Sequence, residues 1–485
     1  MQVLPILLKD FYKTDHRRQY PEGTEEVYSN LTPRGSRIPG INSVVVFGIQ
    51  YFVQEYLIKQ FNENFFWCTK DKAIAAFKRR MDNALGKDAV ATKHMEDLWD
   101  LQYLPLEIKA LPEGSLCPMR IPLLTIRNTD PHFFWLTNDL ETLLSCVLWH
   151  PITSATIAFE YRKMLDAFAK KTSDIPEFVQ WQGHDFSMRG SASIEASMAS
   201  GAAHLLSFTG TDTIPAIDFL ETYYGADSDK ELIGGSVPAT EHSVMCLGGD
   251  ESEQETFERL ITKIYPSGIV SIVSDTWDYW KVIGEILPAL KDKIMAREGR
   301  VVVRPDSGDP VLILCGDDQS YDILKNKGTI EALWDLFGGT VNSKGYKQLD
   351  THIGAIYGDS ITLERCKEIC ERLERKGFAS TNCVFGIGSF TYQYVTRDTF
   401  GFAMKATYGV VNGKPVNIFK NPKTDDGLKK SAKGLLRVNA DFTLSEGVST
   451  EEAETGLLET VFLNGELVRF QTLNEIRTKL LSNVG

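Results

Sequence analysis

Two short segments combine residue types that can act on phosphates or carbonyl groups. In the tripeptide 241–243, His242 lies between a glutamate and a serine, an arrangement suited to an acid, a base or a nucleophile. Further along, Pro305 fixes the backbone between Arg304 and Asp306, so a cation and a carboxylate follow each other. Either segment alone also fits a structural role, because the chain has eight histidines and an Arg–Asp pair can simply stabilise a turn.

Two other segments carry groups suited to a flat amide. Phe186 follows a short extended run and could stack on an aromatic ring, with Arg189 three residues later. Asp212 follows a second extended run and could accept hydrogen bonds from an amide nitrogen. Plain core packing is the alternative for Phe186.

Glycine and lysine residues in the C-terminal half suggest a place for phosphates. Gly388 and Ser389 could offer backbone N–H groups at the start of a helix, and Arg397 could add a charge. An ordinary turn explains the glycines equally well. A basic set within an acidic chain is either a solvated face or a pyrophosphate site; it comprises Lys405, Lys420, Lys429, Lys430 and Lys433.

The stretch from about 178 to 390 must position these groups, because short β-rich runs alternate there with amphipathic helical runs. Strands are predicted at 268–275, 299–306, 354–359 and 382–389. This alternation indicates a parallel sheet, either a barrel or a doubly wound sheet. Each strand ends in polar residues or glycine: Ser274–Asp275, Arg304–Gly308, Gly358–Ser360 and Gly386–Ser389. A single such end could merely cap a helix, but four in succession favour one shared site at the carboxyl ends.

The flanking parts have a different pattern. The first 140 residues mix helices with short extended runs, and turn signals at Asn412–Gly413 and Asn464–Gly465 predict hairpins near the end of the chain. A long helix is expected from about 141 to 170, with a kink or break at Pro151. We predict that the N- and C-terminal parts form one sheet.

The resulting division is an α+β sheet domain from 1–145 and 395–485, and a β/α barrel catalytic domain from 146–394.

Composition limits the class of protein. The 485 residues are 43% hydrophobic and carry a formal net charge of −13, so a nucleic-acid partner is not expected. No signal peptide and no uncharged apolar run of spanning length is visible, which predicts a cytoplasmic protein without a membrane partner. The eight cysteines show no metal-ligand spacing, and Cys366 and Cys370 are expected to be buried thiols.

Taken together, these segments resemble the nicotinamide phosphoribosyltransferase family, of the type II phosphoribosyltransferase group, from about Leu4 to Leu481. The resemblance rests on eleven ordered motifs: DFYKTDH, HDFSMRG, FTGTDT, SVPATEHS, SIVSDTWD, VVRPDSGDP, NSKGYK, YGDS, FGIGS, VTRD and NIFKNP. It implies an irregular β/α barrel with a mixed α+β sheet domain. It also implies transfer of a phosphoribosyl group from phosphoribosyl pyrophosphate to nicotinamide, giving nicotinamide mononucleotide and pyrophosphate in NAD salvage.

The resemblance also assigns roles around the pyridine ring. Phe186 would form one side of a stacking sandwich, and Tyr12 of a second subunit the other, in a homodimer with shared active sites. Asp212 would bind the carboxamide nitrogen, and Arg304 the amide oxygen, with Ser271 in the same pocket.

Further roles concern the sugar and its phosphates. Asp306, Gly358 and Asp359 would lie near the ribose hydroxyls. The remaining assignments are Gly388, Ser389 and Arg397 at the 5′-phosphate, and Arg189, Lys405, Lys420 and Lys429 near the phosphates.

The family likeness makes ATP a co-substrate. It implies that ATP phosphorylates His242 transiently, with Glu241 and Asp275 orienting the imidazole. Mg²⁺ would bind through the substrate phosphates, and Asp275 and Asp306 are the carboxylates considered for direct contact with it.

Other functions are possible for these residues, and the chain departs from the family pattern at three positions. A nicotinate phosphoribosyltransferase is the close alternative, and Asp212 argues against it because two carboxylates would face each other. A barrel hydrolase or aldolase would need a carboxylate dyad or a buried Schiff-base lysine, and a non-catalytic binding protein would not need His242. The chain departs from the family pattern at Ser389, Gly354 and Ala403, which leaves the phosphate contacts and the outer part of the pocket open.

Overall fold

The computed structural model describes residues 4–419 and 432–484, so Lys420 and Lys429 lie outside the described residues. Its contacts divide the chain into two compact units. Unit 1 comprises Met1–Thr156, Leu220–Ala226 and Val395–Leu481; unit 2 comprises Ile157–Phe219, Asp227–Tyr394 and Ser482–Gly485. The predicted division at 145/146 and 394/395 stays a prediction of folding domains, because compactness alone does not show which segments fold independently.

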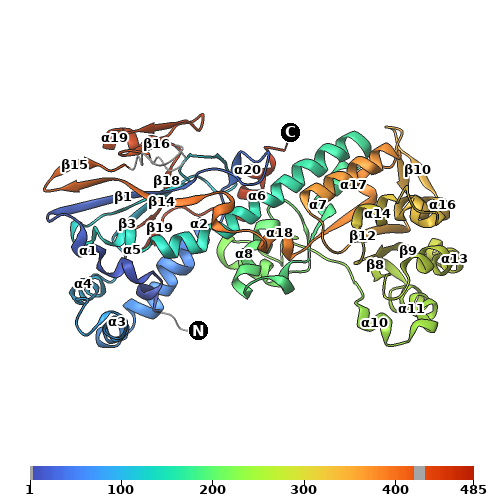
Figure 1. Ribbon diagram of the computed structural model, residues 1–485, viewed down its shortest axis with the longest axis horizontal. Helices are drawn as coiled ribbons and strands as arrows, with labels where there is room; N and C mark the ends of the chain where they lie inside the picture. The colour runs from blue at the N-terminus through green and yellow to red at the C-terminus, as the bar shows by residue number, and fades with distance from the viewer. Residues whose placement is uncertain (1–3, 420–431, 485) are drawn as a thin grey trace. The chain divides into compact units, whose positions relative to one another are not determined.

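Unit 1 is built on a seven-stranded sheet that joins the two ends of the chain (Figure 1). The sheet order is β15-β14-β1-β5-β3-β18-β19, with antiparallel pairing throughout. The strands are β1 Thr24–Pro33, β3 Leu106–Ala110, β5 Leu124–Asn128, β14 Phe402–Val411, β15 Lys414–Asn417, β18 Glu459–Leu463 and β19 Glu466–Leu467. The predicted common sheet of the N- and C-terminal parts is therefore confirmed, as are the hairpin turns at Asn412–Gly413 and Asn464–Gly465.

Helices and small ribbons complete unit 1. The apolar side of the sheet joins a core that includes Phe52, Phe61, Phe65 and Phe77, all nearly inaccessible to solvent. Unit 1 contains two short helical turns, η2 Phe11–Asp15 and η12 Arg397–Thr399. Its helices include α3 Lys70–Leu85, α4 Lys93–Leu101 and α20 Leu473–Leu481. Two small ribbons pair β2 Ser43–Val45 with β4 Leu116–Pro118, and β16 Leu436–Val438 with β17 Leu444–Glu446.

Unit 2 contains a six-stranded sheet in which every pairing is parallel. The order is β7-β6-β13-β12-β9-β8, from β6 Gly183–Asp185, β7 Gly210–Thr211, β8 Ser267–Val273, β9 Glu298–Arg304, β12 Ile353–Tyr357 and β13 Cys383–Ile387. One irregular segment joins the two edges, because Gly235 bridges Gly210 of β7 and Ala239 bridges Ser271 of β8, both in parallel. The expected irregular β/α barrel is thus confirmed.

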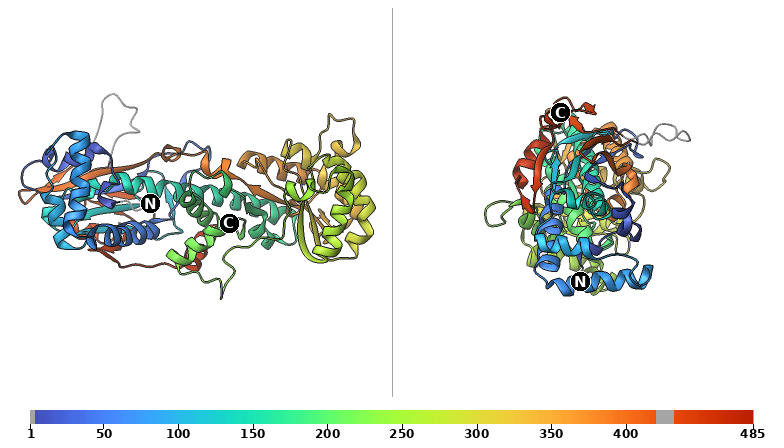
Figure 2. Two further views of the ribbon diagram at one scale, coloured as in Figure 1. Left: turned by 90° about the horizontal axis from the view of Figure 1, so that it is seen from below. Right: turned by 90° about the vertical axis from the view of Figure 1, so that its left-hand side faces the viewer.

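Helices follow the strands of this barrel in chain order (Figures 1 and 2). They include α8 Ile194–His204, α9 Ile214–Tyr224, α10 His242–Cys246, α11 Glu253–Arg259, α13 Leu287–Met295, α14 Pro310–Cys315, α16 Thr329–Phe337, α17 Leu363–Arg375 and α18 Ser389–Gln393. The predicted apolar stripe of α17 is buried at Cys366, Ile369, Cys370 and Leu373. This amphipathic spacing holds the helix against the rest of the unit, as expected for the outer layer of a barrel.

The long helix α6, Glu141–Thr172, is continuous through Pro151. A break at Pro151 is therefore wrong, whereas a kink there stays a prediction. Gly48 lies against the proline ring, since a Cβ at Gly48 would be 2.8 Å from Pro151 Cγ, and so the helix packs closely here despite the missing N–H. By length and composition α6 could cross a membrane, but 72% of its most apolar window is buried inside the protein, as in a core helix of a soluble globular protein.

Candidate active site

A mostly apolar pocket of about 380 Å³ lies within unit 2. Its lining comes from the strands of the barrel, from the segment before β6 and from the segment that joins the sheet edges. The lining residues are Phe178, Trp181, His184, Phe186, Asp212, Gly235, Ser236, Val237, Ala239, Ile269, Ser271, Arg300, Val302, Arg304, Ile356 and Val384. Four predicted substrate-binding residues, Phe186, Asp212, Ser271 and Arg304, are therefore brought together.

Asp212 is the carboxylate of this pocket, and its side chain is 42% exposed. Two side chains of the described residues form hydrogen bonds with the same oxygen: His184 Nε2 lies 2.9 Å and Ser236 Oγ 2.5 Å from Oδ1. Burial by itself raises the pKa of Asp212, but the bonds from His184 and Ser236 and the charge of Arg304 lower it overall. The group is therefore an anion at neutral pH, and Oδ2 is left to accept a hydrogen bond from a ligand.

Arg304 connects this pocket to the acidic groups beyond β9. Its Nη2 donates to the Thr240 carbonyl at 2.7 Å, and its Nε lies 3.5 Å from Asp306 Oδ1. Ser271 Oγ is buried and has no hydrogen-bond partner within residues 4–419 and 432–484. The pocket thus combines an anion, a cation and a spare hydroxyl within apolar walls, a set suited to a small aromatic amide.

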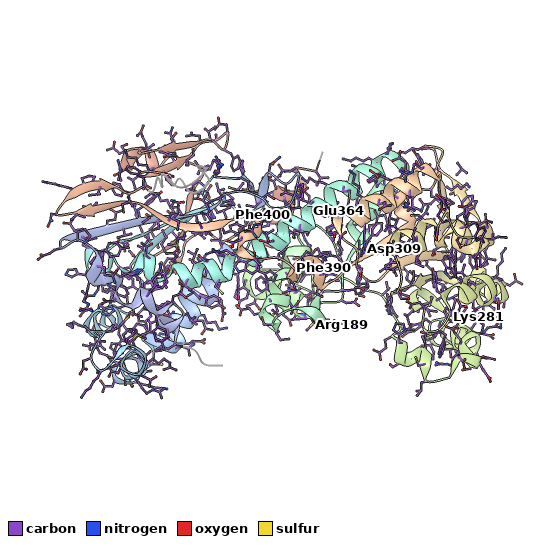
Figure 3. All side chains as sticks on the ribbon, viewed as in Figure 1. Arg189, Lys281, Asp309, Glu364, Phe390 and Phe400 are labelled. Atoms are coloured by element: carbon purple, nitrogen blue, oxygen red, sulfur yellow. The ribbon has the colours of Figure 1, made fainter. Side chains whose placement is uncertain are left out.

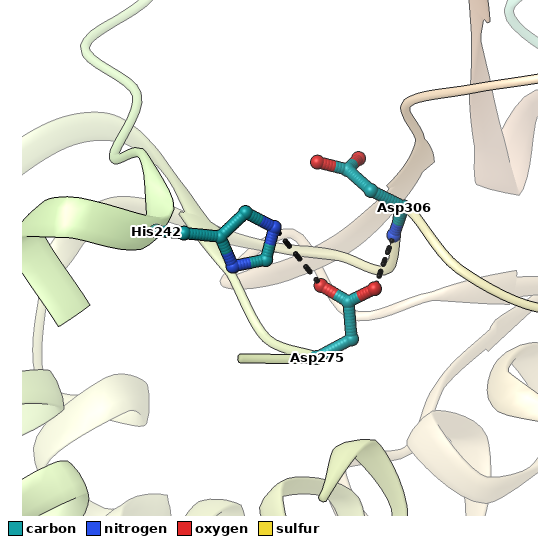
Figure 4. A group of neighbouring side chains, drawn as sticks. All are labelled: His242, Asp275 and Asp306. Atoms are coloured by element: carbon teal, nitrogen blue, oxygen red, sulfur yellow. Dashed lines mark hydrogen bonds and ion pairs between the residues drawn. The ribbon is translucent and has the colours of Figure 1, made fainter. Parts of the chain in front are cut away.

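The second cluster contains His242, Asp275 and Asp306 (Figure 4). His242 opens α10 and is half exposed, with Nδ1 3.2 Å from Thr276 Oγ1 and Nε2 3.9 Å from Asp275 Oδ1. Asp275 lies two residues after the end of β8, and its other oxygen accepts from the Asp306 backbone N–H at 2.9 Å and from Ser307 Oγ at 2.6 Å. The carboxylate is consequently fixed beside a histidine that solvent and a substrate can reach.

Glu241 has a different environment from the one expected. It is the residue before α10, and its carboxylate accepts a hydrogen bond from Ser243 Oγ. The described contacts give Asp275 and Thr276, and not Glu241, beside the His242 ring. An orienting role for Glu241 stays a prediction.

Gly358 is required by the position of Asp306. A Cβ at residue 358 would lie 2.0 Å from Asp306 Oδ1, so this carboxylate occupies the space of the missing side chain. Burial raises the pKa of Asp306, Arg304 opposes the rise, and the neighbouring Asp275 and Asp359 add to it. The close approach of these acids is favourable when a cation or a set of hydroxyl donors faces them.

The same cluster fits a divalent cation. Its three ligand atoms lie within 4.8 Å of one another, and Asp275 Oδ1 and Asp306 Oδ1 are buried without a hydrogen-bond partner in the described part of the chain. Carboxylate oxygens are the ligands that Mg²⁺ takes from proteins, usually one or two beside substrate phosphates. The residues therefore fit the expected ion.

The loops after β12 and β13 bring further predicted residues to the carboxyl edge of the sheet. Asp359 accepts from Ser360 Oγ, and a Cβ at Gly388 would lie 3.8 Å from Asp359 Oδ1. Gly388 precedes α18, so its neighbouring backbone N–H groups open a helix. The short segment η7 Met188–Gly190 contacts α18, and Arg189 and Phe390 are labelled there in Figure 3.

Other predicted residues belong to unit 1. Arg397 lies in η12 beside Asp398, and Lys405 lies in β14 opposite Asn30. Tyr12 lies in η2, is 61% exposed and contacts the His16 ring edge-on at a centroid distance of 5.1 Å, and its role in a second subunit stays a prediction. Lys420 and Lys429 fall outside the described residues, so their roles stay predictions.

Three functional candidates were missed by the sequence reasoning. His184 and Ser236 hold Asp212, and Thr276 contacts the His242 ring. One signal existed for His184, because it lies two residues before Phe186 on a strand and must face the same side. Ser236 and Thr276 lie in irregular segments, where no periodicity predicts a direction.

Comparisons with known proteins identify relatives of this chain by sequence and by fold. A model of the nicotinate phosphoribosyltransferase (NAPRTase) family matches residues 181–466, and a model of the nicotinamide phosphoribosyltransferase N-terminal domain matches residues 5–94. Two solved structures have TM-scores of 0.57 and 0.53, each at 16% identity over 98% of this chain and 93% of theirs: a nicotinate-nucleotide pyrophosphorylase from Pyrococcus furiosus and human nicotinic acid phosphoribosyltransferase. The barrel and its pocket thus define the phosphoribosyltransferase class of enzymes.

Curated relatives narrow this class. The chain is 54% identical to a nicotinamide phosphoribosyltransferase of Acinetobacter baylyi, over 99% of this chain and 97% of the relative. It is 34% identical to one of Mycoplasma genitalium, over 88% of this chain and 94% of the relative. The chain belongs to the nicotinamide phosphoribosyltransferase family.

Proposed function

We propose that this enzyme transfers the phosphoribosyl group of phosphoribosyl pyrophosphate to nicotinamide, giving nicotinamide mononucleotide and pyrophosphate in NAD salvage. The observation that carries the proposal is the anionic Asp212 in a mostly apolar pocket that also contains the cation Arg304. A carboxamide offers N–H groups to Asp212 and an oxygen to Arg304 or Ser271. A nicotinate carboxylate would instead face Asp212 with like charge.

The ring itself needs a stacking surface. Phe186 supplies one wall, and its position is fixed because its backbone N–H donates to the Ile387 carbonyl at 3.0 Å. The opposite wall is proposed to be Tyr12 of a second copy in a homodimer with shared active sites, and the exposure of its ring supports this proposal. Stacking holds the neutral pyridine nitrogen in line with C1 of the ribose.

Transfer of the phosphoribosyl group then depends on stabilising the charge that develops at C1 and on the departing pyrophosphate. The pyridine nitrogen forms a bond to C1 while the bond from C1 to pyrophosphate breaks, and C1 carries positive character in between. Asp306 and Asp359 face the ribose hydroxyls, and the N–H groups near Gly388 and Ser389 receive the 5′-phosphate. Bound Mg²⁺ would be held by Asp275 and Asp306 and would neutralise charge on the departing pyrophosphate.

Basic side chains complete this phosphate site in the proposal. They are Arg189, Arg397, Lys405, Lys420 and Lys429, which contact the phosphates of the substrates in this proposal.

His242 is proposed to accept a phosphoryl group from ATP. A ring nitrogen forms a bond to the γ-phosphorus, the bond to the bridging oxygen breaks, and ADP leaves with that electron pair. Asp275 stabilises the positive charge that the ring gains, and water later releases phosphate from the histidine. The reaction is placed in the cytoplasm, where NAD salvage and ATP meet.

The test is a paired assay of the purified enzyme with phosphoribosyl pyrophosphate and Mg²⁺, using nicotinamide or nicotinate, each with and without ATP. We expect mononucleotide from nicotinamide, with a higher yield when ATP is hydrolysed. Preference for nicotinate would overturn the role of Asp212 and favour the alternative, a nicotinate phosphoribosyltransferase. A yield of mononucleotide that does not depend on ATP would contradict only the proposed role of His242, and the transferase activity would stand.

A further inference from the structure

The loop after β12 has a strained backbone at the residue that follows Asp359. Ser360 has a φ of +59°, in the left-handed region that residues with a side chain rarely adopt. Its hydroxyl donates to Asp359 Oδ2 at 2.9 Å, so the position of Ser360 sets the orientation of that carboxylate. A strained conformation of this kind costs free energy and persists only where neighbouring groups hold it.

Two consecutive carbonyls of this loop are held by side chains. Arg365 Nη1, from the first turn of α17, donates to the Ser360 carbonyl at 2.8 Å. The Tyr161 hydroxyl donates to the Ile361 carbonyl at 2.8 Å. Arg365 lies only five residues from its acceptor, whereas Tyr161 belongs to α6, 200 residues before Ile361 in the chain. Tyr161 therefore ties the loop to a distant segment of unit 2.

The same carbonyl also connects the loop to α18. Thr391 Oγ1 lies 3.3 Å from the Ile361 carbonyl oxygen and 3.4 Å from the Tyr161 hydroxyl oxygen. Thr391 is the third residue of α18, and its backbone N–H donates to the Gly388 carbonyl at 3.2 Å. One buried residue thus receives hydrogen bonds from α6 and α18, which joins the loop of Asp359 to the segment that begins at Gly388.

The Tyr161 side chain is completely buried. Burial raises the pKa of Tyr161, so its hydroxyl is protonated at neutral pH and acts as a donor. A phenylalanine would fill the same space without the cost of burying a hydroxyl. The oxygen atom of Tyr161 therefore contributes chiefly through its bond to the loop, and this contribution can be measured separately from the packing of the ring.

We infer that Tyr161 is a positioning residue for phosphoribosyl pyrophosphate: its hydroxyl holds the strained loop so that Asp359 faces the ribose. This inference rests on the proposed function, which places the ribose hydroxyls at Asp359. The amide end of the site has other supports, because Asp212 is held by His184 and Ser236. Loss of the Tyr161 hydroxyl should therefore affect binding of the sugar phosphate and not of nicotinamide.

The first experiment is the variant Tyr161→Phe, which removes one oxygen atom and keeps the buried ring. We expect KM for phosphoribosyl pyrophosphate to rise about 5-fold to 10-fold, the value of one hydrogen bond, with KM for nicotinamide unchanged. Steady-state kinetics of the full-length enzyme, with each substrate varied in turn, measures both values. A residue that only stabilised the fold would lower the melting temperature and the fraction of active enzyme, and both KM values would stay unchanged.

A double-mutant cycle tests whether the hydroxyl acts through Asp359. Asp359→Ala should raise KM for phosphoribosyl pyrophosphate more than Tyr161→Phe does, because it removes the contact itself. In the double variant, Tyr161→Phe should add less than about twofold, since the loop no longer presents a carboxylate. A full additional rise would show that Tyr161 acts independently of Asp359, and it would overturn the inference.

The second donor to the loop provides an independent pair of variants. Thr391→Val removes the other hydrogen bond to the Ile361 carbonyl and should raise the same KM, whereas Thr391→Ser keeps the hydroxyl and should not. The matched control is Tyr279→Phe, which removes a buried hydroxyl that bonds Thr329 Oγ1 of α16 at 2.8 Å. Both KM values of this control should equal those of the unmodified enzyme.

Two outcomes separate this inference from the proposed function. If Asp359→Ala raises KM for phosphoribosyl pyrophosphate and Tyr161→Phe does not, the positioning role is wrong and the proposed function stands. If Asp359→Ala leaves this KM unchanged, the proposed ribose contact is wrong first, and the role of Tyr161 falls with it. Equal rises of both KM values in Tyr161→Phe would also overturn the inference, because the effect would not be confined to the sugar phosphate.

Discussion

At the scale of single residues, specificity is expected to depend on how Asp212 is held. Because His184 and Ser236 both bind Oδ1, the carboxylate cannot turn freely, and one oxygen keeps a fixed direction into the pocket. His184 lies in β6 and Phe186 directly follows this strand, and both side chains line the pocket. The strand and the residue after it therefore provide the support for the polar anchor and the stacking wall.

Replacing Asp212 by asparagine tests this role. Asp212→Asn removes the anion while keeping the shape, so we expect KM for nicotinamide to rise about 10-fold to 100-fold, the value of one charge-assisted hydrogen bond. Discrimination against nicotinate should fall at the same time, because the like-charge repulsion is gone. Steady-state kinetics with both substrates measures the two effects.

The matched control is Asp229→Asn, which changes the same residue type at an exposed position outside the pocket. Its kinetics should equal those of the unmodified enzyme. Unchanged discrimination in Asp212→Asn would mean that another group selects the amide.

Many residues of this site could be predicted from the sequence, but the contacts that hold them in position could not. Polar residues at strand ends placed Asp275, Arg304 and Asp306 together, because parallel strands bring their carboxyl ends to one edge. The contact of Arg300 with Gly354 depends on the register between β9 and β12, which no local pattern specifies. Thr276 was missed for a related reason, since it lies in a loop whose direction is set by tertiary contacts.

At the scale of elements, four strands of the barrel were predicted to within a few residues, whereas the segment that joins the two edges of the sheet was not predicted. The four predicted strands correspond to β8, β9, β12 and β13, whose alternating helices and apolar runs are strong signals. The segment that joins β7 to β8 through Gly235 and Ala239 contains glycines and a proline, and forms only isolated bridges. Such a segment has no strand periodicity, and so its place between the sheet edges could not be predicted from the sequence.

A buried histidine connects three elements of unit 2. His204 ends α8; its Nε2 lies 3.0 Å from the Gly210 carbonyl of β7, and its Nδ1 lies 2.7 Å from the Tyr392 hydroxyl of α18. Burial lowers the pKa of His204 from 6.5 to about 4, with Asp185 opposing the change. The folded protein therefore keeps the ring neutral, with Nε2–H donating to Gly210 and Nδ1 accepting from Tyr392.

This pKa makes stability depend on pH. The unfolded chain binds a proton near pH 6.5, but the folded chain does so only near pH 4. The contribution of His204 is thus intact above pH 6.5 and falls, by up to about 3 kcal/mol, as the pH drops to 4. Urea unfolding of the full-length protein across this range should show a smaller loss of stability in His204→Gln than in the unmodified protein.

An exposed histidine provides the comparison. His132 is 89% exposed, so His132→Gln should leave the pH dependence unchanged. Equal slopes for His204→Gln and the unmodified protein would contradict the assignment.

At the scale of the whole molecule, the predicted shared site requires a second copy of the chain. Unit 2 contains the pocket, the histidine and the carboxylates, whereas Tyr12 belongs to unit 1. In the proposed homodimer, each site combines unit 2 of one subunit with Tyr12 of the other, and a two-fold axis creates two such sites. The sequence motif DFYKTDH implies this sharing only through the family resemblance, so the prediction needs a test of its own.

Complementation between two inactive variants gives that test. Tyr12→Ala removes the stacking wall that a chain supplies to its neighbour, and Asp306→Ala removes a carboxylate from its own site. Each variant alone should be nearly inactive. If the two are unfolded together and refolded as a mixture, half of the dimers contain one copy of each, and one of their two sites has both groups intact. Activity should therefore return to about one quarter of the unmodified enzyme.

The control mixes Asp306→Ala with Asp275→Ala, two changes in the same cluster of one unit. Every site in that mixture lacks a carboxylate, so no activity should return. Recovery in the first mixture and not in the second would assign Tyr12 to the neighbouring subunit. A monomeric enzyme with full activity, or failure of both mixtures despite correct dimer formation, would instead place the complete site within one chain.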